Sequence, residues 1–312
     1  MIEIVKNRKV WYSISGIFVI ASLIYIAIFG VRFGIDFTGG SVLEISYTQE
    51  RVSVEQLNEV LAENDIESVI IQAADERGYI LKMPQITEDQ RRAIIAGLKN
   101  QIGQETVDEA IVGDEAQPNA LIERRFESIG PVIGQELKTR SLKAVVMVLI
   151  AILLYISWAF RKVSRPVQSW KYGIVALVTL FHDVIITMGV FTLLTHAFGW
   201  EINSAFVAAI LTILGYSVND TIVVFDRIRE NVPKVSGSFA EIVNTSVNQT
   251  VSRSINTSFT TSLVLLAIII FGGSTIQPFV TSLLIGVLIG TYSSIFIASP
   301  LLVSWQLFQR KK

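Results

Sequence analysis

Cysteine is absent from this chain of 312 residues, and histidine occurs only twice. Without cysteine the protein cannot rely on disulfides, whichever redox compartment it occupies. Two histidines and no cysteine leave no spacing typical of a metal site, and the chain contains no GxxxxGK[ST] phosphate-binding loop. We therefore expect no enzymatic activity and no cofactor. If the protein performs work, ion flow is the expected source of energy.

Charge is divided unevenly along the sequence. Residues 31–140 hold 20 acidic and 11 basic side chains, whereas the remainder holds 7 acidic and 15 basic ones. The formal charge of −1 at pH 7 therefore describes neither part. Long apolar runs dominate outside 31–140, and the mean hydropathy of the whole chain is +0.53. The composition indicates a membrane protein with one inserted soluble domain, and we expect no nucleic-acid partner.

Six runs are long enough to cross a hydrocarbon core of about 30 Å, which takes roughly 20 helical residues. We predict membrane helices near 11–29, 142–160, 172–194, 203–225, 254–271 and 279–304. The first run is longer than a usual signal-peptide core and no small-x-small cleavage site follows it, so we interpret it as an uncleaved anchor. The predicted organisation is a tail and first helix at 1–30, a soluble domain at 31–140, and helices two to six at 141–312.

Lysine and arginine predict the orientation, because loops rich in them stay on the cytoplasmic side. With the N-terminus inside, the two outer loops at 195–201 and 272–278 hold no basic residue. The cytoplasmic segments then hold 14 of them: Lys6, Arg8, Lys9, Arg161, Lys162, Arg165, Lys171, Arg227, Arg229, Lys234, Arg253, Arg310, Lys311 and Lys312. We expect a multi-pass protein of the cytoplasmic (inner) membrane with both termini in the cytoplasm and residues 31–140 outside.

Strand and helix patterns alternate between residues 31 and 140. Strand-like runs lie at 42–47, 68–74, 79–83 and 121–129, and helices with Ser and Thr caps lie at 53–64 and 88–101. The order β-α-β-β-α-β is that of a ferredoxin-like split βαβ sandwich. The expected fold is therefore six transmembrane helices with an α+β ferredoxin-like extracytoplasmic domain between helices 1 and 2.

The stretch GIDFTGG at 34–40 links the first membrane helix to this domain, and two interpretations of it are open. In the first, it is a turn in which Gly39 and Gly40 supply unusual backbone angles and Asp36 bonds local amides. In the second, it couples the membrane part rigidly to the domain. We favour the turn on sequence chemistry alone.

A carboxylate inside a membrane helix is rare and often marks an ion or proton path. Asp220 lies about five residues from the cytoplasmic end of the fourth span, which is roughly 8 Å deep at 1.5 Å per residue. It shares a helical face with Thr212, Tyr216, Asn219 and Val223. We expect Tyr216 and Asn219 to solvate the carboxylate.

Arg253 begins the fifth span and can be interpreted in two ways. It can anchor that helix by extending its charged end to the membrane interface. Its side chain is also long enough to reach Asp220 on a facing helix, and this pair would offset the cost of two partly desolvated charges. Protonation of Asp220 would then change which helix packing is favoured, as a proton-driven machine requires.

His182 and Asp183 are adjacent polar residues near the middle of the third span. Because neighbouring residues of a helix point to different faces, two roles are open for them. In the first role, the two residues form a relay for protons or ions. In the second, Asp183 has a structural role and caps a neighbouring helix or bonds a hydroxyl.

Small residues recur at every fourth position in the last two spans. They are Ser254, Ser258 and Ser262 in the fifth, and Ser282, Gly286, Gly290, Ser294 and Ala298 in the sixth. We interpret them as ridges that allow helices to approach closely, without any transport role.

Several motifs resemble those of the SecF family, whose members are half of a resistance-nodulation-division (RND) type arrangement. They are FGIDFTGG after the first span, GPVIGQEL before the second, FHDVIIT in the third, GYSVNDTIVVFDRIREN in the fourth, and SRSINTSFTTS into the fifth. The resemblance covers nearly the whole chain in order. It implies six helices with an extracytoplasmic domain after the first.

The resemblance also implies a function. SecF family members are accessory subunits of the Sec translocase that, with SecD, use the proton-motive force to help move secreted proteins across the cytoplasmic membrane. The implied partners are SecD, the SecYEG channel, the translocating preprotein, membrane lipid and protons. Asp220 and Arg253 match the family's proton relay, with Asn219, Thr257 and Thr261 as supporting polar groups. Residues 237–251 are similar to an amphipathic cytoplasmic helix of the family.

Two other functions are considered. One is an RND-type exporter of small molecules or lipids, but such a chain normally holds two halves with large outer domains and this chain has one small domain. The other is a passive scaffold that stabilises the translocon without carrying protons. A scaffold would tolerate the loss of the Asp220 carboxylate.

Overall fold

The structure, a computed structural model, describes residues 2–74, 76–102, 119–161, 167–273 and 275–310. The chain divides into two compact units. The outer unit is residues 33–140, and the membrane unit combines residues 1–32 with 141–312. Four of the basic residues predicted to be cytoplasmic, Lys162, Arg165, Lys311 and Lys312, lie outside the described residues.

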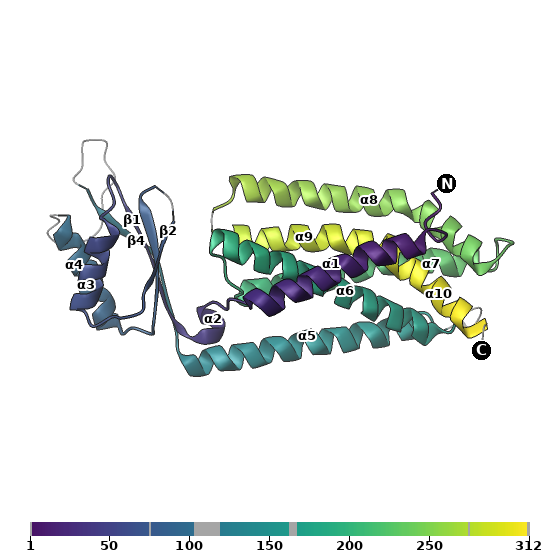
Figure 1. Ribbon diagram of the computed structural model, residues 1–312, viewed down its shortest axis with the longest axis horizontal. Helices are drawn as coiled ribbons and strands as arrows, with labels where there is room; N and C mark the ends of the chain where they lie inside the picture. The colour runs from purple at the N-terminus through teal and green to yellow at the C-terminus, as the bar shows by residue number, and fades with distance from the viewer. Residues whose placement is uncertain (1, 75, 103–118, 162–166, 274, 311–312) are drawn as a thin grey trace. The chain divides into compact units, whose positions relative to one another are not determined.

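Within the described ranges, six helices are long and apolar enough to cross a membrane, as the sequence predicts. The first five are α1 (Arg8–Phe29), α5 (Pro131–Ala159), α6 (Ser169–Phe198), α7 (Ser204–Asn231) and α8 (Phe239–Phe271) (Figure 1). The sixth comprises α9 (Gln277–Ser293), the π-helix η1 (Ser294–Ala298) and α10 (Ser299–Arg310). Helix α5 begins well before the predicted span at 142 because the motif GPVIGQEL is itself helical from Pro131.

The stretch 237–251 is helical from Phe239, and its buried residues Ile242, Val243, Ser246, Val247 and Thr250 recur at the spacing of one helical face, as expected for an amphipathic helix. This helix is continuous with the fifth span. A capping box at Ser238 and Glu241 begins α8 at Phe239. No glycine or proline occurs between 239 and 271, so the backbone hydrogen bonding continues without interruption into the fifth span. Arg253 consequently lies in the interior of one long helix.

Helices α6, α7 and α9 form the centre of the membrane unit. Helix α9 packs against α6, α7 and α8, and α1 packs against α6 (Figure 1). Of the residues in the most apolar stretch of each helix, 56% are buried in α6, whereas only 11% are buried in α1 and 11% in α5. The exposed faces of α1 and α5 therefore suit lipid or further membrane helices.

Two glycines allow α7 and α9 to approach closely. A Cβ atom added at Gly286 would overlap the Ile213 side chain, and one added at Gly290 would lie 2.8 Å from the Cβ of Ser217. These contacts support the interpretation of the small residues as a packing ridge at these two positions.

The described part of the outer unit contains six main elements in the predicted order β-α-β-β-α-β. They are β1 (Gly40–Tyr47), α3 (Val54–Glu63), β2 (Ile70–Ala73), β3 (Gly78–Met83), α4 (Glu88–Gln101) and β4 (Leu121–Ile129). The strands form an antiparallel sheet in the order β2-β3-β1-β4. Leu43 of β1 lies opposite Leu81 of β3, and both pack with Leu57 of α3 and Ile94 of α4 in one core. Strand β2 begins after Ser68, whose φ of +62° belongs to the left-handed region rather than to a strand.

The glycine motif at 34–40 forms a short helix followed by a turn. Helix α2 (Ile35–Thr38) carries Asp36 in its first turn, and Gly39 and Gly40 follow with φ of +75° and +131°. A Cβ on Gly39 would lie 2.8 Å from the Cα of Pro131, so both the backbone angle and the close approach require glycine. The turn interpretation agrees with this geometry, and a coupling role for Asp36, Gly39 and Gly40 stays a prediction.

The cap of α3 gives a first testable prediction. Ser53 Oγ accepts from the Gln56 amide at 3.3 Å, and the Ser53 amide donates to Gln56 Oε1 at 2.9 Å. We expect Ser53→Ala to lower the free energy of unfolding of the outer unit by about 1 kcal/mol, measured by denaturant unfolding of the full chain. Ser53→Asp should retain most of the stability because aspartate also caps. An equal loss in both variants would contradict a capping role.

Glu88 at the start of α4 gives a second prediction. Hydrogen bonding to Arg91 is the main cause that lowers the pKa of Glu88 from 4.5 to about 2. Because the folded-state pKa is depressed, the ionised carboxylate stabilises the outer unit above pH 4.5, and this contribution disappears as the pH falls toward 2. We expect Glu88→Gln to make unfolding less sensitive to pH in that interval. The effect should be small, since exposed ion pairs are screened by solvent. Unfolding midpoints of the two chains, compared across that interval, should converge at its acidic end.

Candidate functional site

The Asp220 carboxylate is held by serines from two other helical segments. Ser254 of α8 donates to Oδ1, and Ser294 of η1 donates to Oδ2 at 2.5 Å. Both serines are buried. A charged group in a poorly solvated interior is costly unless hydrogen bonds compensate it. The two serine hydroxyls supply such bonds to the Asp220 carboxylate, and each hydroxyl oxygen can also accept a hydrogen bond.

The position of Ser294 depends on a local change in helix type. Pro300 has no amide hydrogen to donate to the preceding turn, and its ring would clash with a carbonyl there. The helix widens into η1 at 294–298, and Ser299 Oγ donates to the Ser294 carbonyl at 3.4 Å. Such π segments inside α-helices are frequent at functional sites. Here the segment begins at the residue that bonds Asp220.

Asp220 and Arg253 line one small cavity of about 60 Å³, which is roomy enough for water. Tyr216, Asn219, Val223 and Thr257 complete its lining. In the part of the chain that the structure describes, the predicted ion pair between Asp220 and Arg253 is not formed, and the Arg253 side chain is exposed. The structure thus brings the two residues to one cavity without joining them.

The other predicted polar residues surround this cavity rather than bonding the carboxylate. The Tyr216 hydroxyl lies 3.4 Å from the hydroxyl oxygens of both Ser258 and Thr261, and its single hydrogen can be donated to either. Thr257 Oγ1 donates to the Arg253 carbonyl at 2.9 Å, and Asn219 is exposed at the cavity wall. Ser254 and Ser294 therefore occupy the role expected for Tyr216 and Asn219.

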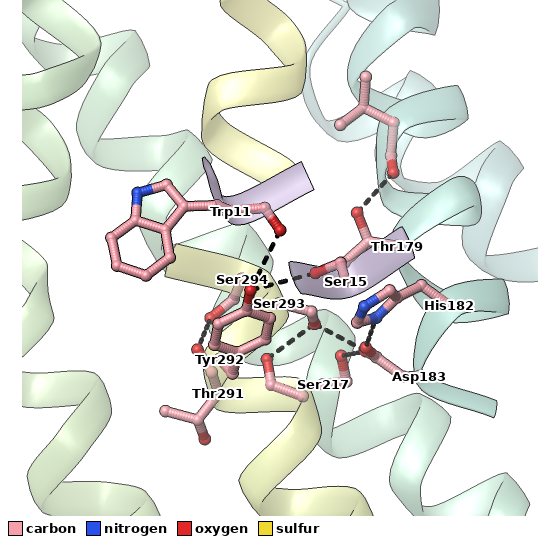
Figure 2. A network of polar contacts seen from close by, with 12 residues as sticks. Trp11, Ser15, Thr179, His182, Asp183, Ser217, Thr291, Tyr292, Ser293 and Ser294 are labelled. Atoms are coloured by element: carbon pink, nitrogen blue, oxygen red, sulfur yellow. Dashed lines mark hydrogen bonds and ion pairs between the residues drawn. The ribbon is translucent and has the colours of Figure 1, made fainter. Parts of the chain in front are cut away.

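A second carboxylate lies in a network of polar contacts between membrane helices (Figure 2). Asp183 of α6 is fully buried. Its Oδ1 lies 2.9 Å from His182 Nδ1, and its Oδ2 accepts from Ser217 at 2.5 Å and from Ser293 at 2.9 Å. Asp183 therefore bonds hydroxyls, as one of the two sequence interpretations proposes. The adjacent His182 turns toward it instead of facing away.

Tyr292 extends this network toward α1. Its hydroxyl accepts from Ser15 at 3.1 Å and donates to the Trp11 carbonyl at 3.3 Å (Figure 2). Its ring lies 6.4 Å from the His182 ring, at 25° to it. The network thus connects α1, α6, α7 and the sixth span.

Sequence reasoning missed the serines that hold the two carboxylates. The spacing of small residues predicts a packing ridge that includes Ser254 and Ser294, and no pattern in the sequence predicts a role for Ser217 or Ser293. The available signal was chemical: hydroxyls on apolar spans are candidates to bond a buried carboxylate in a neighbouring span. The tandem Ser293-Ser294 a few residues before Pro300 was a second signal.

Similarity to solved structures defines the class of protein. The crystal structure of SecDF from Thermus thermophilus, described as a translocon-associated membrane protein, matches with a TM-score of 0.79 and 32% identity. The match covers 97% of this chain and 38% of that one. SecDF in a super-membrane-facing form matches with a TM-score of 0.66 and 31% identity, over 99% of this chain and 39% of that chain. Together with the six membrane-length helices, these matches define a multi-pass membrane protein of the RND type.

Sequence similarity gives the family. Models of the families "Protein export membrane protein SecD/SecF, C-terminal" and "SecD/SecF GG Motif" match residues 111–307 and 24–50. Protein translocase subunit SecF of Thermobaculum terrenum is 41% identical over 98% of this chain and 94% of that protein. SecF of Anaerolinea thermophila is 35% identical over the same shares. The chain belongs to the SecF family of protein translocase subunits, which confirms the resemblance found in the sequence.

Proposed function

We propose that this chain acts with SecD in the Sec translocase and uses the proton-motive force to assist the movement of secreted proteins across the cytoplasmic membrane. The observation that carries this proposal is the Asp220 carboxylate, held within a membrane-length helix by Ser254 and Ser294. The names of the relatives support the translocase role: they are protein translocase subunits SecF and SecDF. No enzymatic turnover is part of the proposal.

Asp220 is the proton carrier in this proposal. When ionised it accepts from Ser254 on α8 and from Ser294 on η1, and it bridges these two segments to α7. When protonated it donates one hydrogen bond, so one serine must reorient or lose its partner. The relative packing of the three segments then differs between the two states. A membrane potential supplies about 2.3 kcal/mol per charge per 100 mV to drive the cycle.

Arg253 acts as the counter-ion on the other side of the cavity. Its exposed side chain is free to extend toward Asp220 across the space that both residues line. A guanidinium near the carboxylate favours the ionised form and so promotes release of the proton. Asn219, Thr257 and Thr261 keep the surroundings polar while Arg253 moves.

The orientation follows from the distribution of basic residues. Both termini lie in the cytoplasm, and the outer unit is an extracytoplasmic ferredoxin-like domain, consistent with its strand order β2-β3-β1-β4. The apolar surfaces of α1 and α5 contact lipid and the SecD half. The remaining partners are the SecYEG channel and the translocating preprotein.

The test is export of a secreted protein by vesicles that contain this chain, SecD and SecYEG. Export assistance should require an imposed proton gradient and disappear when a protonophore collapses it. A sodium gradient of equal size should not replace the proton gradient. Assistance that persists without any gradient would contradict the proposal and support a passive scaffold. Sodium-driven assistance would contradict the choice of ion.

A further inference from the structure

The His182–Asp183 pair is not absorbed by the proposed relay at Asp220. We infer that this pair is a second proton-binding site, and that its proton occupancy is coupled to that of Asp220 through serines of α7 and the sixth span. The coupling rests on the proposed function, whereas the proton-binding site itself does not. The class of ligand is the proton.

The burial of Asp183 is the first reason to expect a bound proton at the pair. Its carboxylate is fully buried, and no lysine or arginine contacts it in the described part of the chain. Two hydroxyls and one imidazole nitrogen are its partners. An isolated buried carboxylate is strongly disfavoured, so one added proton, shared with His182, lowers the electrostatic cost of the pair.

The second reason is the ring nitrogen Nε2 of His182, to which a proton can add. Nδ1 is engaged by Asp183, while Nε2 is buried and has no hydrogen-bond partner among the described residues. The His182 residue is only 8% exposed. With Nδ1–H donating to an ionised Asp183, a neutral imidazole keeps its lone pair on Nε2, where a proton can add. Among the buried polar side-chain atoms that have no partner in the described residues, Nε2 is the basic nitrogen, so it is the one that can take up a proton.

The groups around the pair favour a proton over a metal cation. Ser217 of α7 and Ser293 of the sixth span donate hydrogen bonds to Asp183, and the ring of Tyr292 in the sixth span lies beside His182. From α1 come only Ser15 and the Trp11 carbonyl, which are bonded to Tyr292. Helix α10 also packs against α6, and the α6 partners of its described residues Gln309 and Trp305 are Lys171 and Trp170, not the pair. Both serine hydroxyls already donate to Asp183, so a cation would have to displace them.

The coupling follows from the way in which the two carboxylates share their supports. On α7, Ser217 bonds Asp183, and one turn later Asp220 bonds Ser294. On the sixth span, the consecutive residues Ser293 and Ser294 bond Asp183 and Asp220, respectively. A shift of η1 that accompanies protonation of Asp220 therefore displaces Ser293 as well. By linkage, protonation of the His182–Asp183 pair must then alter the proton affinity of Asp220.

The chain suits a direct titration because it contains only two histidines. The variant His196→Gln leaves His182 as the single imidazole. We would label only this chain with ¹⁵N-histidine, combine it with unlabelled SecD in lipid nanodiscs, and record the imidazole resonance as a function of pH. This baseline needs no change at the proposed site, so it is informative even if the site variants fail to fold.

The expected result is a titrating His182. Asp183→Asn should move the midpoint of the His182 resonance to lower pH by about 1 unit or more, because an anionic neighbour is lost. Asp220→Asn and Ser293→Ala should each move the midpoint by about 0.7 pH unit or more, which corresponds to the lower end of typical coupling energies. Thr187→Val is the matched control: Thr187 is buried on the same helix, its hydroxyl has no partner among the described residues, and its loss should leave the midpoint unchanged.

Four outcomes would overturn parts of the inference. A His182 resonance that does not change between pH 5 and 9, or one that responds to sodium rather than to pH, overturns the proton site. A titrating His182 whose midpoint ignores both Asp220→Asn and Ser293→Ala overturns the coupling. An equal shift in Thr187→Val shows a general packing effect and also overturns the coupling. If Asp220→Asn abolishes gradient-driven export while His182 does not titrate, the proposed function stands and this inference fails. If His182 titrates but Asp220→Asn leaves gradient-driven export intact, the proton site at His182–Asp183 stands and the proposed function fails.

Discussion

Replacing Asp220 with asparagine should abolish the part of protein export that depends on the proton gradient, while the chain remains folded and abundant. Asparagine has nearly the same size and can still hydrogen-bond Ser254 and Ser294, but it cannot take up or release a proton. The membrane potential supplies about 2.3 kcal/mol per charge per 100 mV, but in this variant no proton can bind at position 220 and use that energy. Export by vesicles with the variant should equal that of the unmodified protein after the gradient is collapsed.

Asp226→Asn provides the matched control on the same helix. Asp226 pairs with Arg229 at 2.5 Å, and their side chains are 41% and 44% exposed, respectively. An exposed pair of this kind contributes little, so this variant should export like the unmodified chain. Full gradient-dependent export by Asp220→Asn, with the protein present at normal levels, would contradict the relay. It would favour a scaffold role for the chain.

The membrane helices and the need of Asp220 for polar partners could be predicted from the sequence because both rest on burial. An apolar run of about 20 residues has few alternatives to spanning a membrane. A carboxylate within such a run must have partners, whatever the fold. The reach of its side chain predicts Arg253 near Asp220, and the family resemblance adds Thr257. All three line one cavity in the structure.

The partners of the carboxylates could not be predicted in the same way. Helical spacing gives the face that a residue shares within its own helix, but it does not give the helix that this face meets. Tyr216 was expected to solvate Asp220 from the same helix, yet Ser254 and Ser294 from other segments do so. The position of Ser294 depends further on η1, a departure from α-helical geometry that hydrophobic periodicity does not encode.

In the outer unit, the elements were predictable and their exact pairing was not. Alternation and Ser or Thr caps marked the strands and helices, and the capping boxes at Ser53 and Thr87 are formed. The register between β1 and β4 shifts between Glu44 and Ile45, and a single strand pattern contains no signal for such a bulge.

Gly189→Ala should be among the most destabilising single substitutions in the membrane unit. Gly189 lies on α6 where α1 packs against it, and an added Cβ would overlap the Ser22 side chain and lie 2.7 Å from the Ser22 Cα. Because the obstructing atoms include backbone, relief requires the whole of α1 to move. Overpacking of this kind costs about 1–3 kcal/mol. Thermal unfolding of the purified chain in nanodiscs should show a lowered midpoint.

Gly215→Ala is the control that isolates this steric effect from helix propensity. Gly215 lies inside α7, and an added Cβ there would meet nothing within 4 Å. Alanine favours a helix over glycine by up to about 1 kcal/mol, so Gly215→Ala should be neutral or stabilising. Alanine has the same advantage in helix propensity at Gly189, so the cost of overpacking against Ser22 must exceed that advantage for the unfolding midpoint to fall. A Gly189→Ala chain as stable as Gly215→Ala would show that α1 moves aside at no cost, and that the close α1–α6 contact does not depend on glycine.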